Sequence, residues 1–325
     1  MRILVTGSSG HLGEGLMRVL RADGADVVGL DILPGAFTDL VGSIVDRTLV
    51  RRALEDVDAV LHTATLHKPH VGSHSRQEFV DTNITGTLNL LEESAAANVT
   101  RFVFTSTTSA FGRALTPKPG GPAAWITEDV SPIPRNVYGV TKTSAEDLCE
   151  LVHRDHGLPV LILRTSRFFP ESDDRDEVRA AYDDANLKAN ELLYRRVDLE
   201  DAIAAHKLAL ERAPTLGFGR YIISATTPFT REDLNELTTD APAVVARHVP
   251  EYATLYDRLG WRMFPTIERV YDNARARNEL GWTPRYDFRH ALTRIAAGQP
   301  GRSDLAEAVG AKGYHPVSTG PYTVR

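Results

Sequence analysis

The sequence predicts an α/β fold, in which a doubly wound parallel sheet is followed by a smaller C-terminal lobe. Short apolar runs alternate with helical patterns through the first half of the chain, and these runs are continuously apolar instead of alternating apolar with polar. Strands of that kind are buried on both faces, and right-handed crossovers place helices on both sides of one sheet. The 325 residues, 42% of them hydrophobic and 25% charged, are enough to enclose a large core.

The first half of the chain provides the strands and helices of this sheet. The run Ile3-Leu4-Val5 predicts the first strand, and Leu12, Leu16 and Leu20 recur after it at helical spacing. Further apolar runs and helical periods follow in alternation. We expect strands at residues 3–6, 26–30, 59–62, 101–105 and 160–163, and helices at residues 48–54, 78–97 and 138–156.

The pattern changes after Arg164. Residues 109–133 already carry several prolines and predict a loop, because proline does not fit interior strands. Later we expect helices at 199–212, from 231, at 273–280 and at 288–297, with a strand at 220–224. We therefore assign residues 1–165 to the sheet domain, 166–298 mainly to the smaller lobe with some segments returning to the sheet, and 299–325 to an irregular tail.

Composition excludes several classes of function. A net charge of −6 argues against nucleic-acid binding. The single cysteine, Cys149, allows neither an intrachain disulfide nor a thiolate metal site, and it fits a reducing compartment. No apolar run approaches the roughly 20 residues of a membrane span, and the N-terminus lacks the pattern of an export signal. We expect a cytoplasmic protein without a membrane or nucleic-acid partner.

A glycine turn lies between the first strand and the first helix. Gly7, Gly10 and Gly13 permit a tight turn and let a pyrophosphate approach the helix N-terminus, where free N–H groups and the helix dipole hold the anion. Asp31 ends the second strand, where a carboxylate accepts a hydrogen bond from a ribose 2′-OH. This pairing predicts a Rossmann-type domain that binds NAD in preference to NADP.

Tyr138 and Lys142 are four residues apart on a predicted helix and therefore share one face. A nearby ammonium lowers a tyrosine pKa, which suits a general acid or base at neutral pH. A run of hydroxyl side chains from Thr105 to Ser109 follows the strand at 101–105, at the sheet edge where ligands bind, although such runs also form ordinary turns. Thr107 and Thr108 are candidates there for hydrogen bonds to a substrate.

Together these residues resemble the extended short-chain dehydrogenase/reductase family, in its NAD-dependent epimerase/dehydratase branch. The matching segments run in family order over about residues 1–290. They are Thr6-Gly7-x-x-Gly10-x-x-Gly13, Asp31, Asn83-x-x-Gly86-Thr87, Tyr138-x-x-x-Lys142, Leu163-Arg164, Val197-Asp198-Leu199-Glu200-Asp201-Ala202 and Glu279-Leu280-Gly281-Trp282-Thr283-Pro284. Within the branch, the chain looks most like the nucleotide-sugar 4-epimerases.

The resemblance implies a role for each matching position. Tyr138 would be the acid/base, Lys142 would hold the cofactor ribose and tune Tyr138, and Thr107 would be the active-site hydroxyl. The remaining positions would contact NAD: Gly10, His11 and Leu12 through pyrophosphate-binding amides, Ser43 and Ile44 beside the adenine, and Thr63, Ala64 and Asn83 along the cleft. The family also implies a homodimer through the helices at 78–97 and 138–156.

The sequence departs from the family in ways that bear on the substrate. Thr107 is followed by Thr108-Ser109-Ala110 without a carboxylate, which disfavours a 4,6-dehydratase. Arg167 replaces a usual Asn and would either bind an anionic group or pair with the acidic run that follows, and Arg262 falls near a usual diphosphate-binding Arg. Tyr194 follows Arg167 by only 27 residues, a short segment that favours a substrate smaller than a full nucleotide sugar, or one held differently.

Four histidines lie close together in the sequence, at positions 62, 67, 70 and 74. They invite a zinc interpretation, but no acidic residue or cysteine joins them at ligand spacing. We interpret this segment as a loop that lines the cofactor cleft and predict no metal.

The sequence leaves three functions to compare. The first is an NAD-dependent epimerase that acts on a sugar or nucleotide-sugar hydroxyl through a transient keto intermediate. The second is an NAD(P)-dependent dehydrogenase or reductase of a smaller hydroxyl or keto compound. The third is a non-catalytic regulator on the same fold, against which the presence of Tyr138, Lys142 and Thr107 argues.

Overall fold

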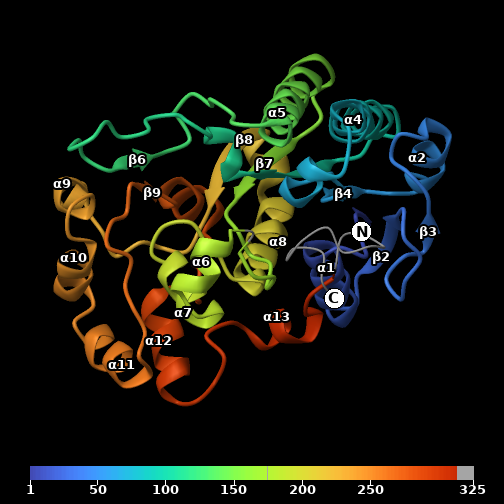
Figure 1. Cartoon of the computed structure of the whole chain (residues 1–325). Helices are drawn as coiled ribbons and strands as arrows, with labels where there is room; N and C mark the ends of the chain where they lie inside the picture. The colour runs from blue at the N-terminus through green and yellow to red at the C-terminus, as the bar shows by residue number, and fades with distance from the viewer. Residues whose placement is uncertain (174, 313–325) are drawn as a thin grey trace.

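The computed structural model describes residues 1–173 and 175–312, and its centre is one large sheet (Figure 1). Within these residues seven strands pair in parallel in the order β3-β2-β1-β4-β5-β7-β8. Their bounds are Arg2–Thr6 for β1, Asp26–Asp31 for β2, Leu40–Val41 for β3, Ala59–His62 for β4, Arg101–Thr107 for β5, Val160–Thr165 for β7 and Phe218–Ile223 for β8. Every residue of β4 and β7 is buried, as expected for strands covered on both faces. The doubly wound parallel sheet is therefore confirmed.

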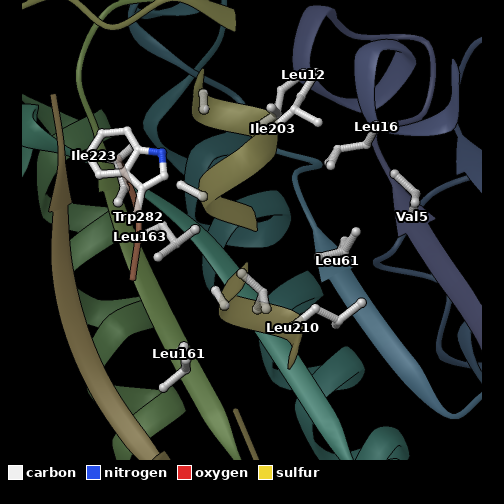
Figure 2. Packing of buried hydrophobic residues seen from close by; sticks show 14 of the residues in the cluster. Val5, Leu12, Leu16, Leu61, Leu161, Leu163, Ile203, Leu210, Ile223 and Trp282 are labelled. Atoms are coloured by element: carbon white, nitrogen blue, oxygen red, sulfur yellow. The ribbon is translucent and has the colours of Figure 1, made fainter. Parts of the chain in front are cut away.

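Two long helices cover one face of the sheet. Helix α1 (His11–Ala22) and helix α8 (Leu199–Leu216) pack side by side, and Figure 2 shows Leu16 and Ile203 above the strand residues Leu61 and Leu163. Trp282 completes this layer, and its indole N–H donates to the Asp201 carbonyl at 2.9 Å. Residues far beyond the first domain thus return to cover it.

Three helices cover the opposite face: α2 (Arg47–Ala53), α4 (Gly86–Ala96) and α5 (Val137–His156). Most of the helix predicted at 78–97 is present, but α3 (Arg76–Val80) and α4 are joined by a π-helical turn at Asp81–Thr85. A π turn rotates the residues on either side of it and is frequent at functional sites. Here it contains Asn83, one of the expected cofactor residues.

The smaller lobe has a core of its own. Its short parallel pair joins β6 (Ala124–Ile126) to β9 (Arg269–Tyr271). Its helices are α6 (Asp176–Ala181), α7 (Asp184–Glu191), α9 (Leu234–Leu237), α10 (Ala241–His248), α11 (Glu251–Leu259) and α12 (Phe288–Ala296). In Figure 1, α9 to α12 are drawn in orange and red, and α6 and α7 in yellow-green. The segment at 109–133 is mostly loop, yet it supplies β6 to this lobe, so a segment of the predicted first domain packs in the second.

Short helical turns occur between these elements. They are the 3₁₀ turns Lys68–Gly72, Thr108–Phe111 and Arg231–Asp233 and the π turn Ala276–Leu280. Thr108–Phe111 directly follows β5 and contains hydroxyl residues that the sequence marks as candidates.

The prediction of an irregular tail from residue 299 is wrong at helix α13 (Asp304–Val309). Ser303 caps this helix by accepting the Ala306 N–H at 3.1 Å, and its own N–H donates to Asp198 at 2.9 Å. Ala306 and Val309 are buried against the α1 and α8 layer. The helix has only six residues, between Gly301 and Gly310, and so few residues do not show a recognisable helical periodicity in the sequence. Residues 313–325 of the predicted tail lie outside the described residues.

None of the helices found in residues 1–173 and 175–312 combines the length and the apolar character that crossing a bilayer requires.

Candidate active site

A cavity of about 1370 Å³ lies at the carboxyl ends of β1, β4, β5 and β7. Strand order reverses between β1 and β4, which is where ligands bind in doubly wound sheets. One side of the cavity is formed by the glycine turn and the loops after β2 and β4, and we call this side the cofactor half. The other side is formed by residues 105–109, by Tyr138 and by residues from 165–169, 175–195 and 264–271, and we call it the substrate half.

The glycine turn leaves no room for side chains. Gly7 has φ +74° and donates its N–H to the Leu30 carbonyl at 2.7 Å. A Cβ on Gly13 would lie 1.9 Å from the Gly7 carbonyl oxygen, and a Cβ on Gly7 would lie 2.7 Å from the Ala64 nitrogen. Helix α1 therefore begins in close contact with the end of β1, and its N-terminal residues line the cavity.

Helix α1 begins at His11, and its N-cap residue, Gly10, offers no side-chain acceptor to the first turn. Gly10, His11, Leu12 and Gly13 all line the cavity. An uncapped helix N-terminus with glycines on one side is suited to an anion such as a pyrophosphate. These four residues therefore fit the pyrophosphate position expected from the sequence.

Asp31 lies at the end of β2 and lines the cavity. Its Oδ2 accepts the Ser9 N–H at 2.9 Å, and its Oδ1 accepts the Leu33 N–H at 2.9 Å. These bonds fix the carboxylate between the glycine turn and the loop after β2, and each oxygen keeps acceptor capacity for a ribose hydroxyl. The placement fits NAD.

The expected adenine and cleft residues also lie on the cofactor half, where Ser43, Ile44, Thr63 and Ala64 all line the cavity. Ser43 accepts the Val45 N–H at 3.2 Å and so shapes its own loop. Thr63 donates its hydroxyl to the Thr6 carbonyl at 2.7 Å, which joins the ends of β1 and β4.

The buried side chain of His62 links the strands and the helix behind the cofactor half. His62 Nδ1 lies 2.7 Å from the Thr6 hydroxyl, and Nε2 lies 3.0 Å from the Thr87 hydroxyl. Thr87 donates to the Asn83 carbonyl at 2.7 Å, so His62 donates from Nε2 and accepts at Nδ1. Burial, with a smaller contribution from Lys142, holds the pKa of His62 well below its usual value. The ring is thus a neutral link that positions β1, β4 and α4.

Asn83 lies behind the cavity wall instead of on it. Its amide oxygen accepts the Leu66 N–H at 2.8 Å, and its amide nitrogen donates to the Leu66 carbonyl at 2.8 Å and to the Thr141 hydroxyl at 3.0 Å. The side chain is buried and joins the loop after β4 to helix α5. It therefore positions cavity residues, whereas the family resemblance implies direct contact with the cofactor cleft.

Tyr138 and Thr107 meet in the wall of the substrate half. Thr107 ends β5, Tyr138 lies in the first turn of α5, and the two side chains are close enough for the Thr107 hydroxyl to favour the Tyr138 phenolate. Burial raises the pKa of Tyr138 to about 12, and the nearby Thr107 hydroxyl only partly offsets that rise. The expected lowering of this pKa by Lys142 is wrong, because desolvation dominates.

Lys142 is buried one turn further along α5. Its Nζ lies 3.9 Å from the centroid of the Phe104 ring, a cation–π contact. Burial lowers the pKa of Lys142 to about 7, against weaker opposing effects of Cys149 and Glu146. At neutral pH the ammonium is therefore close to losing its proton, so any added negative group nearby would favour the charged form.

Sequence reasoning missed the ion pair that supports the end of β5. Glu146 and Arg164 are both buried and lie 2.7 Å apart, and Ser106 donates its hydroxyl to Glu146 at 2.5 Å. Ser106 lies on β5 next to Thr107, Glu146 lies on α5 and Arg164 lies on β7. This network therefore joins the three elements beside Thr107. The matching Leu163-Arg164 motif was the available signal.

The expected substrate residues are divided by the structure. Thr108 and Arg167 line the cavity, whereas Arg262 does not and is exposed, with its guanidinium bonded to the Ala181 carbonyl. Arg167 pairs with the buried carboxylates of Asp173 at 3.0 Å and Glu191 at 3.1 Å. The ion-paired alternative for Arg167 is therefore present in the structure.

A contact at the pyrophosphate position was not expected either. His11 Nε2 lies 2.9 Å from Glu171 Oε1, and both side chains are almost fully buried. Burial opposes ionisation of Glu171, but His11 and the Lys312 N–H lower its pKa. The Lys312 side chain also pairs with Glu14 on α1, so the end of the described chain lies beside the glycine turn.

The histidines after β4 gather at the cavity edge. His67 and His70 line it, their rings are 4.7 Å apart, and His70 Nδ1 accepts the His67 N–H at 3.0 Å. Within residues 1–173 and 175–312 no group of three or more His, Cys, Asp or Glu side chains has a geometry that could hold a metal ion.

The sheet order, the glycine turn and the Tyr138–Thr107 contact define a dinucleotide-dependent α/β enzyme. The chain belongs to the NAD dependent epimerase/dehydratase family, whose model matches residues 3–216. The cofactor of this family is NAD, and the uncapped turn at Gly10 and the Asp31 carboxylate at the end of β2 fit it.

Individual proteins resemble the chain over most of its length. Sterol demethylase protein B of Methylococcus capsulatus is 30% identical over 322 residues, which cover 87% of this chain and 94% of that protein. UDP-glucose 4-epimerase of Lactobacillus helveticus is 27% identical, in an alignment that covers 88% of this chain and 93% of that enzyme. A dTDP-glucose 4,6-dehydratase of Neisseria meningitidis is also 27% identical, over 90% of this chain and 91% of that enzyme.

Solved structures show the same fold. A short-chain dehydrogenase/reductase superfamily protein from Agrobacterium tumefaciens with bound NAD superposes with a TM-score of 0.66 at 25% identity, over 91% of this chain and 96% of that one. A UDP-N-acetylglucosamine 4-epimerase from Bacillus cereus superposes with a TM-score of 0.63 at 22% identity, over 91% and 98% of the two chains.

Proposed function

We propose that this chain is an NAD-dependent epimerase that inverts a hydroxyl-bearing carbon of a sugar or nucleotide sugar through a transient keto intermediate. The observation that carries the proposal is the adjacent pair of Tyr138 and Thr107 in the wall of a cavity that also contains the glycine turn. A phenol and a hydroxyl side by side can bind one substrate oxygen and move its proton.

The cofactor half would hold NAD. Gly10, His11 and Leu12 would present amides to the pyrophosphate, and Asp31 would accept from the adenosine ribose. Ser43, Ile44, Thr63 and Ala64 line the same half and would contact the adenine and the remaining cleft. NAD, when bound, accepts a hydride from the carbinol carbon and returns it to the keto group.

Tyr138 would remove the proton from the substrate hydroxyl and give it back in the second half-reaction. Burial raises its pKa to about 12, which is too high for a base at neutral pH, so a cation must favour the phenolate. Lys142 shares its helix face, and we assign it this role together with binding of the ribose. Thr107 would orient both the phenol and the substrate oxygen.

We do not propose a 4,6-dehydratase, although such enzymes are among the relatives. The turn after Thr107 is Thr108-Ser109-Ala110-Phe111, which brings no carboxylate to the substrate oxygen. The carboxylates that line the described part of the cavity are Glu14, Asp31, Glu78, Asp81 and Glu268. None of them is in the turn that follows Thr107, where an elimination would require an acid.

The second candidate is a dehydrogenase of a smaller hydroxyl compound. It is favoured by the aromatic wall of the substrate half, where Phe264 packs against Tyr182 and Tyr194 with ring centroids 5.2 and 6.0 Å apart. Phe168 and Phe169 line the same half. An apolar wall favours a substrate with an apolar body over a strongly hydrated sugar.

The two candidates differ in cofactor balance. Purified protein should be incubated with UDP-glucose, UDP-N-acetylglucosamine and UDP-glucuronic acid, the compounds named for structural neighbours, while absorbance at 340 nm and sugar products are followed. An epimerase retains NAD through purification and converts its substrate without added cofactor. Net NADH formation in step with substrate loss would instead support the dehydrogenase, and product formation with neither signature would contradict both.

Homodimer formation through α4 and α5 stays a prediction. Val140 and Leu151 on α5 are 49% and 39% exposed, which is consistent with a partner on this face.

A further inference from the structure

A buried contact joins the glycine turn to the segment that follows β7, which contributes to the substrate half. His11 Nε2 lies 2.9 Å from Glu171 Oε1, and only 3% and 1% of these side chains are exposed. His11 is the first residue of α1, whereas Glu171 lies between β7 and α6. The ring of Phe169, which lines the substrate half, lies beside the His11 ring, with centroids 6.4 Å apart. The two halves of the cavity are therefore connected at the expected pyrophosphate position.

The C-terminal arm, which we define as residues 303–312, reaches the same place from the other end of the chain. Helix α13 anchors the arm, because its apolar side chains are buried against α1 and α8. Gly310 ends the helix with φ +62°, a conformation that glycine adopts readily. Lys312 then donates its N–H to Glu171 at 3.1 Å, and its ammonium pairs with Glu14 on α1. The arm thus binds both elements that the His11 contact joins.

Glu14 gives the arm a fixed partner on the cofactor half. It follows Gly13 directly, lines the cavity and is only 11% exposed at its side chain. Arg18 Nη2 lies 2.7 Å from Oε1 of Glu14, and Lys312 pairs with Oε2. Both oxygens are therefore held by cations, so the carboxylate is neutralised beside a position where an anion is expected.

We propose that Glu171 and Lys312 are positioning residues that clasp the pyrophosphate-binding turn and slow the release of NAD. Glu171 holds the side chain of His11, whose amide is expected to face the pyrophosphate, and Lys312 ties Glu171 to Glu14. The inference rests on the proposed function, because it requires NAD in the cofactor half. A slow release suits an epimerase, since the hydride must return to the substrate before the reduced cofactor leaves.

One substitution separates this clasp from a simple balance of charge. If Lys312 only neutralised Glu14, then Glu14→Gln would remove a negative charge near the pyrophosphate and would slow the release of the cofactor. If Lys312 closes the clasp, Glu14→Gln removes its partner and the release becomes faster. The two accounts therefore predict changes of opposite sign.

The rate of cofactor release tests the clasp directly. Full-length protein loaded with NADH is mixed with excess NAD in a stopped-flow instrument, and the loss of bound NADH fluorescence gives the rate. Glu171→Gln should release NADH about tenfold faster, the expected cost of losing a buried charge-assisted contact. Lys312→Met and Glu14→Gln should each release it about threefold faster, because the Lys312 ammonium is partly exposed. Lys312→Arg should recover the wild-type rate.

The matched control is Lys207→Met, which removes an ion pair between α8 and Asp23 at the other end of α1 and should leave the rate unchanged. An unchanged rate in Lys312→Met, or slower release in Glu14→Gln, would overturn the clasp while leaving the proposed function intact. If Glu171→Gln fails to fold, Lys312→Met provides the comparison. Failure of the wild-type protein to bind NADH would instead contradict the proposed function, and the clasp with it.

Discussion

The two halves of the cavity are held together by different kinds of interaction. The cofactor half is mainly backbone: glycines without room for a Cβ, an uncapped helix N-terminus and a carboxylate fixed by the Ser9 and Leu33 amides. The substrate half is made of side chains from distant segments, joined by the ion pairs of Asp173 and Glu191. Backbone geometry of this kind suits any dinucleotide, whereas we expect the side chains of the substrate half to determine which substrate is accepted.

Removing a link between the sheet domain and the segment that returns to it from the smaller lobe should produce the largest loss of stability. Asp201 on α8 accepts the N–H groups of Arg285 and Tyr286, each at 2.8 Å, and so joins the returning segment to the sheet domain. Asp201→Ala leaves two backbone donors without their acceptor and should lower the free energy of unfolding by about 2–4 kcal/mol. Urea unfolding monitored by circular dichroism measures this loss.

Asp257→Ala is the matched control for this substitution, since Asp257 is exposed on α11, and it should change the free energy of unfolding by less than about 0.5 kcal/mol. Equal stability of Asp201→Ala and wild type would show that the two parts are held together elsewhere.

A pH series tests whether Lys142 is as buried as the structure shows. Burial lowers its pKa from 10.5 to about 7, so between these values the unfolded chain binds more protons than the folded one. Stability of the NAD-free protein relative to Lys142→Met should therefore rise with pH from about 7 to 10.5, by at most about 1.4 kcal/mol per pH unit. A stability difference that does not change with pH would contradict the burial of the ammonium.

A smaller effect is expected for cofactor choice. Asp31→Asn removes the negative charge that disfavours a 2′-phosphate, so the preference for NAD over NADP should fall by about tenfold. The measurement is the dissociation constant of each dinucleotide by fluorescence titration. Asp26→Asn, at the exposed other end of β2, should leave the ratio unchanged. An unchanged ratio of the two dissociation constants in Asp31→Asn would show that this carboxylate does not select between NAD and NADP.

The cofactor half was largely predictable because its signals are local. Gly7, Gly10 and Gly13 lie in one turn between a strand and a helix, and Asp31 ends the next strand. The Tyr138 to Lys142 spacing likewise required only helical geometry. The direction of the Tyr138 pKa shift was not predictable, because burial depends on the packing of residues distant in the sequence.

The substrate half was not predictable in detail, because its contacts join residues that are distant in the sequence. Arg167 and Arg262 looked alike as candidate cations, but only Arg167 lines the cavity, and it does so paired with Asp173 and Glu191. The π turn at Asp81–Thr85 directs Asn83 toward α5, which a regular helical period does not anticipate.

The central claim is that Tyr138, beside Thr107 in the cavity wall, moves the proton of the substrate hydroxyl. The most direct measurement compares wild type with Tyr138→Phe, using kcat on the substrate identified by the product assay and the dissociation constant for NAD. The phenol is lost while the ring and the cavity remain, so kcat should fall about 100- to 10,000-fold with NAD affinity within about threefold of wild type. Full activity in Tyr138→Phe would contradict the account.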